Sequence, residues 1–181
     1  MATFTLYKFQ IELSDIPRAL YQTLEFRAAK HPSESMPYFL TRVIAYALNY
    51  QEDLVFAPTG LHDPDAAAIS VPDLSGGHRM LIEIGSPSAR KLHKATKTAR
   101  QVKVYTYKNP QSLVDEILAE KVHRAQEIDV YSLAPAFLAE LEPHLKTNNR
   151  WDLMFNDGTV SIQIGEQGIS GELGVHSTSA F

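Results

Sequence analysis

One stretch of the sequence places a basic helix between two apolar strands, and this order constrains the fold more than any other feature. HRMLIEIG, residues 78–85, and VKVYTY, residues 102–107, have the apolar character of buried strands. Residues 86–101 between them carry small apolar side chains on one side of a helical projection and cations on the opposite side. A strand, a helix and a second strand in this order predict a mixed α/β fold.

The remainder of the chain alternates predicted strands and helices. Residues 3–13 alternate apolar and polar side chains and predict a strand, after which Ser14 or Asp15 is expected to cap a helix that extends toward Lys30. A long helix that faces the core is expected within residues 31–50. The other predicted elements are strands at 54–58 and 129–134, helices at 112–124 and 135–145, and a C-terminal hairpin at 153–164.

The composition predicts one domain, residues 1–181, that does not enter a membrane. Of the 181 residues, 44% are hydrophobic and 21% are charged, as expected for an ordinary globular domain. The chain has no cysteine, so disulfides and thiolate sites are excluded. The N-terminus lacks a basic segment followed by an apolar run, and no 18 apolar residues occur in succession, so a cytoplasmic location is expected.

Positive charge is concentrated in one segment of an otherwise acidic chain. Between Ile84 and Val114 there is no Asp or Glu, and the segment holds seven cations: Arg90, Lys91, Lys94, Lys97, Arg100, Lys103 and Lys108. The net charge of the whole chain is -4, which leaves -11 for the remainder. Four side chains of the predicted helix fall within roughly 60° of arc: Arg90, Lys94, Lys97 and Gln101. This face is either a solvated surface or a surface that binds an anion.

Three acids are candidate ligands of a cation, and each also has a structural explanation. Glu83 interrupts a strand that is expected to be buried on both faces, where a carboxylate without a cation or hydrogen-bond donors is costly. Asp73 lies between Pro72 and two glycines and suits a turn. Glu34 lies near the start of a predicted helix, where the helix dipole favours an acid. Of the three, Glu83 has the weakest structural explanation.

These residues resemble the YaeQ family of bacterial proteins, on HPSE at residues 31–34 and on the run DLSGGHRMLIEIGSPSARKLHKATKTARQVKVYTY from residue 73 to 107. The resemblance implies a variant of the restriction-endonuclease-like PD-(D/E)XK fold, extended here by a C-terminal helix and hairpin. It also implies that Glu34, Asp73 and Glu83 bind a divalent metal. The pattern would place a lysine at position 85, where this chain has glycine. The resemblance implies that Lys94 on the following helix replaces it, with Arg90 and Lys91 as near alternatives.

The expected function is therefore metal-dependent cleavage of a phosphodiester, with Mg²⁺ or Mn²⁺ as cofactor. Asp73, Glu83 and Lys94 are the expected catalytic residues, and a main-chain carbonyl such as that of Ile84 would complete the metal site. The residues expected to contact nucleic acid are Arg90, Lys91, Lys97 and Gln101. The alternative is a module on the same fold that binds nucleic acid or an acidic protein partner without catalysis.

Overall fold

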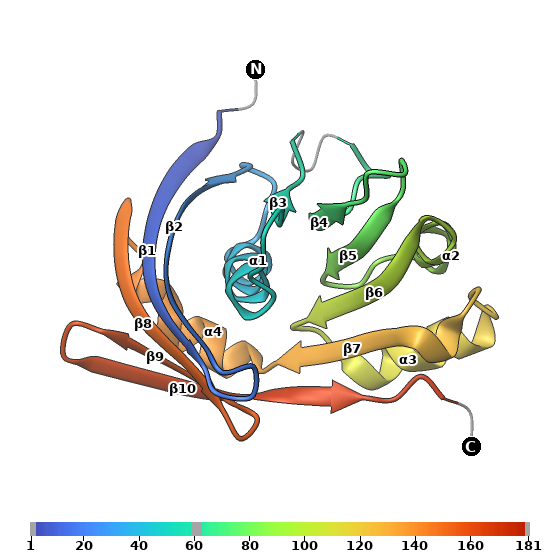
Figure 1. Cartoon of the computed structure of the whole chain (residues 1–181). Helices are drawn as coiled ribbons and strands as arrows, with labels where there is room; N and C mark the ends of the chain where they lie inside the picture. Colours follow the sequence, from blue (N-terminus) through green and yellow to red (C-terminus); the bar gives the residue numbers. More distant parts are fainter. Residues whose placement is uncertain (1–2, 59–62, 180–181) are drawn as a thin grey trace. The chain divides into compact units, whose positions relative to one another are not determined.

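The computed structural model describes residues 3–58 and 63–179, and the contacts within the chain define two compact units. The first unit comprises Met1–Asn49 and Leu133–Leu173, and the second comprises Tyr50–Ser132 and Gly174–Phe181. Each unit combines strands of a sheet with two α-helices, which confirms the mixed α/β class (Figure 1). The single domain stays a prediction, because compact units of this kind need not fold separately.

The sheet of the first unit has the strand order β2-β1-β8-β9-β10. The strand bounds are β1 Thr5–Asp15, β2 Leu20–Lys30, β8 Asn148–Asn156, β9 Thr159–Ile164 and β10 Gln167–His176. β1 is antiparallel to β2 and parallel to β8, whereas β9 is antiparallel to both β8 and β10. The predicted hairpin is confirmed as β8 and β9, and Asp157 and Gly158 adopt positive φ in its turn.

Helix α1, Met36–Leu48, packs on this sheet and confirms the long core-facing helix predicted from the sequence. Ser35 caps it by accepting a hydrogen bond from the backbone N–H of Tyr38. The buried Phe9 ring lies 5.1 Å from Trp151 and 6.4 Å from the α1 residue Phe39, measured between ring centroids. α4, Pro135–Leu141, packs against α1 and continues into a short 3-10 helix, η3, at Glu142–His144.

The helix predicted from Ser14 or Asp15 toward Lys30 is wrong, because this segment forms the hairpin strand β2. Asp15 does not cap a helix; its carboxylate accepts a hydrogen bond of 2.6 Å from Nε of Arg18 in the turn. Ala19 then adopts a φ of 51°, which reverses the chain. Leu24 and Ala28 are both buried, and their spacing of four fits a strand face as well as a helix face.

The sheet of the second unit has the strand order β7-β6-β5-β4-β3. The strand bounds are β3 Val55–Phe56, β4 Ile69–Pro72, β5 His78–Ile84, β6 Ala99–Thr106 and β7 Ile128–Leu133. β3, β4 and β5 are antiparallel neighbours, whereas β5, β6 and β7 are parallel. The strand and helix order predicted for residues 78–107 is confirmed, while β4 and β10 were not predicted.

Two helices of the second unit, α2 at Ala89–Thr98 and α3 at Pro110–Ala119, connect its parallel strands (Figure 1). Their apolar side chains form one buried cluster with those of the strands: Leu81, Leu92, Ala95, Val102, Val104, Leu113, Ile117 and Val130. The short 3-10 helix η2, Ala125–Glu127, precedes β7. Among the helices of the residues that the structure describes, none has the length and apolar character needed to cross a membrane.

Gly85 turns the chain from β5 into the approach to α2. Its φ is 84°, and its N–H donates a hydrogen bond of 2.9 Å to the carbonyl of Tyr105. A residue with a Cβ is strained at this φ, whereas glycine is not. The missing lysine at position 85 therefore has a conformational reason.

Replacing Gly85 with lysine is expected to lower the free energy of unfolding by about 1 to 2 kcal/mol, because lysine must adopt the left-handed conformation. Chemical denaturation of both proteins measures the difference. Ser86→Lys is the matched control. Ser86 is exposed, and this substitution adds the same positive charge one residue later. Equal losses in the two variants would contradict the conformational explanation.

Candidate active site

A pocket of about 480 Å³ lies in the second unit between β5 and α2, and we name it the Glu83 pocket. Its charged lining consists of two acids and three lysines: Asp65, Glu83, Lys91, Lys94 and Lys97. The acids come from β5 and from the segment before β4, and the lysines come from successive turns of α2. The pocket therefore combines carboxylates with cations, as sites that act on phosphate esters require.

Glu83 is buried, with 3% of its surface exposed, as expected from its place in an apolar strand. Period-two alternation puts it on the same face of β5 as Leu81, the face that α2 covers. Its Oε2 lies 3.1 Å from Nζ of Lys91 on α2. Lys91 is therefore the lysine that contacts Glu83.

Burial raises the pKa of Glu83 from 4.5 to about 7, because desolvation disfavours the charged carboxylate. The ammonium of Lys91 acts in the opposite direction and limits the rise. A carboxyl with a pKa near neutrality can accept or release a proton under ordinary conditions. Perturbed pKa values of this kind concentrate at functional sites.

Lys94, the lysine expected to act beside Glu83, lies one turn further along α2 and pairs with Asp65. Its Nζ is 3.2 Å from Oδ2 of Asp65, and both side chains are more than half exposed. The backbone N–H of Asp65 donates to Oδ1 of Asp63, which fixes the loop before β4. Lys94 thus lines the Glu83 pocket but contacts a different acid.

The structure does not bring Asp73 to Glu83. Pro72 pairs with His78, so Asp73 lies at the turn of the β4–β5 hairpin, while Glu83 is five residues from His78 toward the other end. At about 3.4 Å per residue, this separation is roughly 17 Å along the strand. Asp73 instead lies 2.9 Å from Arg100, and the Ser75 N–H and the Arg100 guanidinium lower the pKa of its carboxyl.

Glu34, the third expected metal ligand, is buried in the first unit and pairs with an arginine. Nη2 of Arg42 donates to Oε1 at 3.0 Å and to Oε2 at 3.1 Å. The backbone N–H of His31 also donates to Oε1, at 3.3 Å. These contacts give the Glu34 carboxylate a cationic partner within its own unit.

The residues expected to contact nucleic acid have different environments. Arg90 and Lys97 are exposed and form no ion pair with any residue in the described ranges. Gln101 does not lie on the helix as predicted, because it belongs to β6; it is exposed, and its Nε2 donates to Oδ2 of Asp129. Lys91 contacts Glu83, as described above. Of the four, Arg90 and Lys97 retain a charge that no acid of the described ranges neutralises through an ion pair.

A second depression adjoins the Glu83 pocket, and we name it the Arg100 depression. The two share four lining residues: Gly77, His78, Lys97 and Thr98. The Arg100 depression is also lined by Asp73, Arg100 and Arg124. A Cβ on Gly77 would lie 2.9 Å from the carbonyl oxygen of Thr98, so only glycine fits where the depressions meet.

Asp65 is the residue of this site that the sequence analysis missed. In an antiparallel hairpin, the start of the first strand lies opposite the end of the second, and here Ile69 pairs with Ile82. The acid nearest to Glu83 is thus expected just before Ile69. Pro72 and Asp73 match the first two letters of the PD-(D/E)XK motif, but Pro72 is the last residue of β4 and Asp73 follows it. The available signal was the strand boundary in the segment DPDAAAIS, residues 63–70.

Comparison with known proteins identifies relatives of this chain. A family model described as "YaeQ protein" matches residues 1–173. "Uncharacterized protein YaeQ" from Escherichia coli (strain K12) is 28% identical over 103 residues, which are 57% of this chain and 56% of the relative. The aligned region thus spans little more than half of the curated relative.

Two solved structures share the fold of this chain. The crystal structure of YaeQ protein from Xanthomonas axonopodis pv. citri has a TM-score of 0.88 and 23% identity, covering 97% of this chain and 99% of that one. The crystal structure of YaeQ protein from Pseudomonas syringae has a TM-score of 0.85 and 25% identity, covering 95% of both chains.

The raised pKa of Glu83 predicts a pH dependence of stability. Because the folded pKa lies above the unfolded value, the folded state holds the proton more tightly, so stability falls as pH rises from 4.5 to about 7. The loss is on the order of 3 kcal/mol. Glu83→Gln is expected to remove this pH dependence. The free energy of unfolding of the variant minus that of the wild type should therefore be larger at pH 8 than at pH 5.

Denaturant unfolding at both pH values measures this effect. Glu116→Gln on α3 is the control, because Glu116 is exposed and should give the same pH profile as the wild type. A Glu83→Gln variant that loses about 1 to 3 kcal/mol at pH 8 would instead show that Glu83 is a structural partner of Lys91.

Proposed function

The chain belongs to the YaeQ family, and from this premise and the Glu83 pocket we propose that it is a metal-dependent phosphodiesterase that acts on nucleic acid. The observation that carries the proposal is the pairing of two acids with two lysines in one pocket: Asp65 with Lys94 and Glu83 with Lys91. The buried Glu83 also has a pKa near neutrality, as expected of a group that binds a cation or a proton.

The donor set of the pocket suits Mg²⁺ or Mn²⁺. Carboxylate oxygens are the ligands that these hard cations prefer, and Mg²⁺ retains several waters. The described residues contain no group of three or more His, Asp or Glu that could hold a metal. Two carboxylates, Asp65 and Glu83, with a main-chain carbonyl such as that of Ile84, are sufficient for a cation that keeps its waters. When bound, such a cation lowers the pKa of water and stabilises charge on phosphate.

The lysines of α2 complete the proposed site. Lys91 is held beside Glu83 and is only a quarter exposed, so its ammonium is the better placed to orient a water nucleophile. Lys94 is more exposed and suits a contact with a phosphate oxygen. Lys91 then takes the role that the sequence analysis gave to Lys94. Since Gly85 excludes a side chain at its own position, the charge comes from the helix.

This arrangement supports the resemblance to the PD-(D/E)XK superfamily, with one change in its residues. The superfamily places one acid at the start of a strand and another on the hairpin partner. Asp65 before β4 and Glu83 near the end of β5 fit that rule, whereas Asp73 lies at the turn. Asp65 therefore replaces Asp73 as the proposed metal ligand.

The Arg100 depression provides a path for the rest of the polymer. Lys97 lines both the pocket and the depression, and Arg100 is three-quarters exposed. Phosphates on one side of the cleaved bond could contact these cations, which supply affinity without sequence specificity.

The competing function is a module that binds nucleic acid, or an acidic protein, without cleavage. The specific observation in its favour is that the ammonium of Lys91 already occupies one oxygen of Glu83. A cation that neutralises the acid internally removes the need for a metal. Metal binding and cleavage distinguish the two functions.

Isothermal titration with Mn²⁺ tests the metal site. Asp65→Asn and Glu83→Gln are each expected to weaken binding by about tenfold or more, because each removes a direct ligand. Asp73→Asn is the matched control and should bind as the wild type does. If Asp73→Asn alone weakened Mn²⁺ binding, the metal would instead bind at the turn of the β4–β5 hairpin.

Cleavage assays on single- and double-stranded DNA and RNA test the reaction. Lys91→Ala is expected to abolish Mg²⁺-dependent cleavage while metal binding persists, and Lys94→Ala to reduce it less. Lys97→Ala should mainly weaken nucleic-acid binding and reduce the slope of log K against log salt by about 1.

Lys108→Ala serves as the control for these variants, because Lys108 lies outside both depressions. Salt-sensitive binding of nucleic acid without metal-dependent cleavage would leave the binding module as the function. Neither binding nor cleavage would favour an acidic protein partner.

A further inference from the structure

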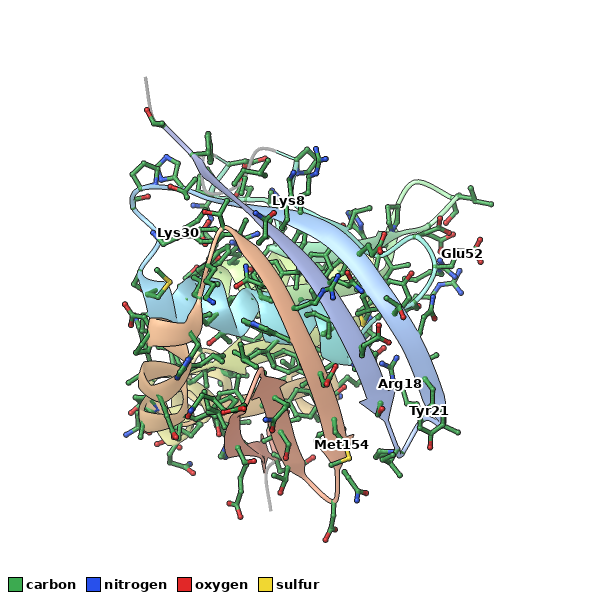
Figure 2. The ribbon with its side chains drawn as sticks, turned by 90° about the vertical axis from the view of Figure 1, so that its left-hand side faces the viewer. Lys8, Arg18, Tyr21, Lys30, Glu52 and Met154 are labelled. Carbon is green, nitrogen blue, oxygen red and sulfur yellow. The ribbon has the colours of Figure 1, made fainter. Side chains whose placement is uncertain are left out.

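A third depression, of about 490 Å³, lies on the strands β1, β2 and β8 of the first unit. Figure 2 turns these three strands toward the viewer and labels Lys8 on β1. The depression is lined by Lys8, Phe9, Gln10, Glu25, Phe26, Arg27, Asn148, Asn149 and Arg150. Three of these are cations and one is an acid. Nothing in the proposed phosphodiesterase uses this surface.

Strand register brings the polar residues together on one face. Lys8 is paired with Arg27 on β2 and with Asn148 on β8. Two residues along β1, Gln10 is paired with Glu25 and with Arg150. The intervening position on each strand turns inward. The polar side chains therefore form two adjacent rows across three strands.

The three cations lack an acidic partner among the residues that the structure describes. Within the described part of the chain, Lys8, Arg27 and Arg150 form no ion pair, and neither does Glu25. Lys8 and Arg27 stand directly opposite one another, and like charges in that position destabilise a sheet. Three positive charges and one negative charge leave the depression with a net charge of +2. A bound anion would offset this repulsion.

The geometry points to a binding site for an oligophosphate, a ligand with two or more linked phosphates. Guanidinium groups such as those of Arg27 and Arg150 bind phosphate oxygens in a bidentate manner. The diagonal spacing of Lys8 and Arg150, about 7 to 8 Å between Cα atoms, suits linked phosphates better than a single one. The amides of Gln10 and Asn148 form no hydrogen bond with a described residue and can donate as well.

The size of the depression agrees with such a ligand. Small-molecule sites typically measure about 300 to 1,000 Å³, and this one falls within that range. An oligophosphate could be inorganic or could be carried by a nucleoside. The phosphate chemistry is the same in both cases, and the experiment distinguishes the two sources.

Isothermal titration of the full chain tests the site with three probes at matched ionic strength: inorganic pyrophosphate, ATP and sulfate. Pyrophosphate is expected to bind with one-to-one stoichiometry and sulfate at least about tenfold more weakly, because it makes fewer charge-assisted contacts. Tighter binding of ATP than of pyrophosphate would identify a nucleoside-borne ligand. Equal or weaker binding would identify the inorganic form.

Variants locate the binding. Lys8→Gln and Arg150→Gln are each expected to weaken pyrophosphate binding about tenfold, since each removes one charge-assisted contact. Glu25→Gln should strengthen it several-fold, because it removes the only acid that lines the depression. Glu140→Gln on α4 is the matched control, as Glu140 is exposed and does not line the depression. All four side chains are exposed, so the melting temperature should change little.

The Arg100 depression of the second unit is the competing location. A Lys97→Gln and Arg100→Gln double variant is expected to keep pyrophosphate binding. Loss of binding in that variant, with retention in Lys8→Gln and Arg150→Gln, would overturn the proposal. Absence of pyrophosphate binding, or equal affinity for sulfate, would overturn it as well. None of these results bears on cleavage at the Glu83 pocket, so the two proposals fail separately.

Discussion

The burial of one carboxylate, that of Glu83, is the constraint on which the candidate site depends. β5 is covered on both faces, so an acid in this strand loses its hydration and needs a cation from a neighbouring element. The parallel pairing of β5 with β6 requires a crossover helix, and α2 provides both the crossover and Lys91. Gly85 permits the turn between strand and helix. The packing of the core and the chemistry of the site thus depend on the same three elements, β5, α2 and β6.

Hairpin direction decides which acid accompanies Glu83. The sequence places Asp73 ten residues before Glu83, and the family resemblance implied that the two acids bind one metal. Antiparallel pairing, however, brings together residues near the two ends of a hairpin and separates the turn from them. Asp65 lies eighteen positions before Glu83 in the sequence, yet it lines the same pocket. A motif therefore needs the strand boundaries before its residues can be assigned.

The fold was predictable where one periodicity dominated. Residues 78–107 show clear strand, helix and strand patterns, and the order of these elements is confirmed. The helix was predicted too long, because α2 ends at Thr98 and residues 99–101 belong to β6. Residues 20–30 were mistaken for a helix because their leucines, glutamate and alanines favour helices, and Leu24 and Ala28 satisfy both periods. Pairing along the full length of β1 overrode that local preference. β4 escaped prediction because it has only four residues.

The sequence predicted Glu83 as a residue of the site, but it did not predict which residues contact Glu83. The isolated acid in an apolar strand is a signal within the sequence, whereas the choice between Lys91 and Lys94 depends on how α2 is rotated over β5. Helical angle alone gives the relative positions of side chains and not the direction in which the face points. Packing of Leu92 and Ala95 into the core sets that rotation, and Lys91 then reaches the strand.

The ion pairs also change the meaning of the basic segment. Lys91, Lys94 and Arg100 are each paired with an acid from β5 or the loops around β4, so less positive charge is available than the sequence suggests. If a divalent cation binds Asp65 and Glu83, the two lysines lose those acidic partners, and Lys94 becomes available to phosphate. Metal and polyanion would then bind cooperatively, and by linkage each would raise the affinity for the other by the same factor. On this argument the internal ion pairs oppose each ligand when it binds alone, and they couple the two ligands of the proposed function when both bind.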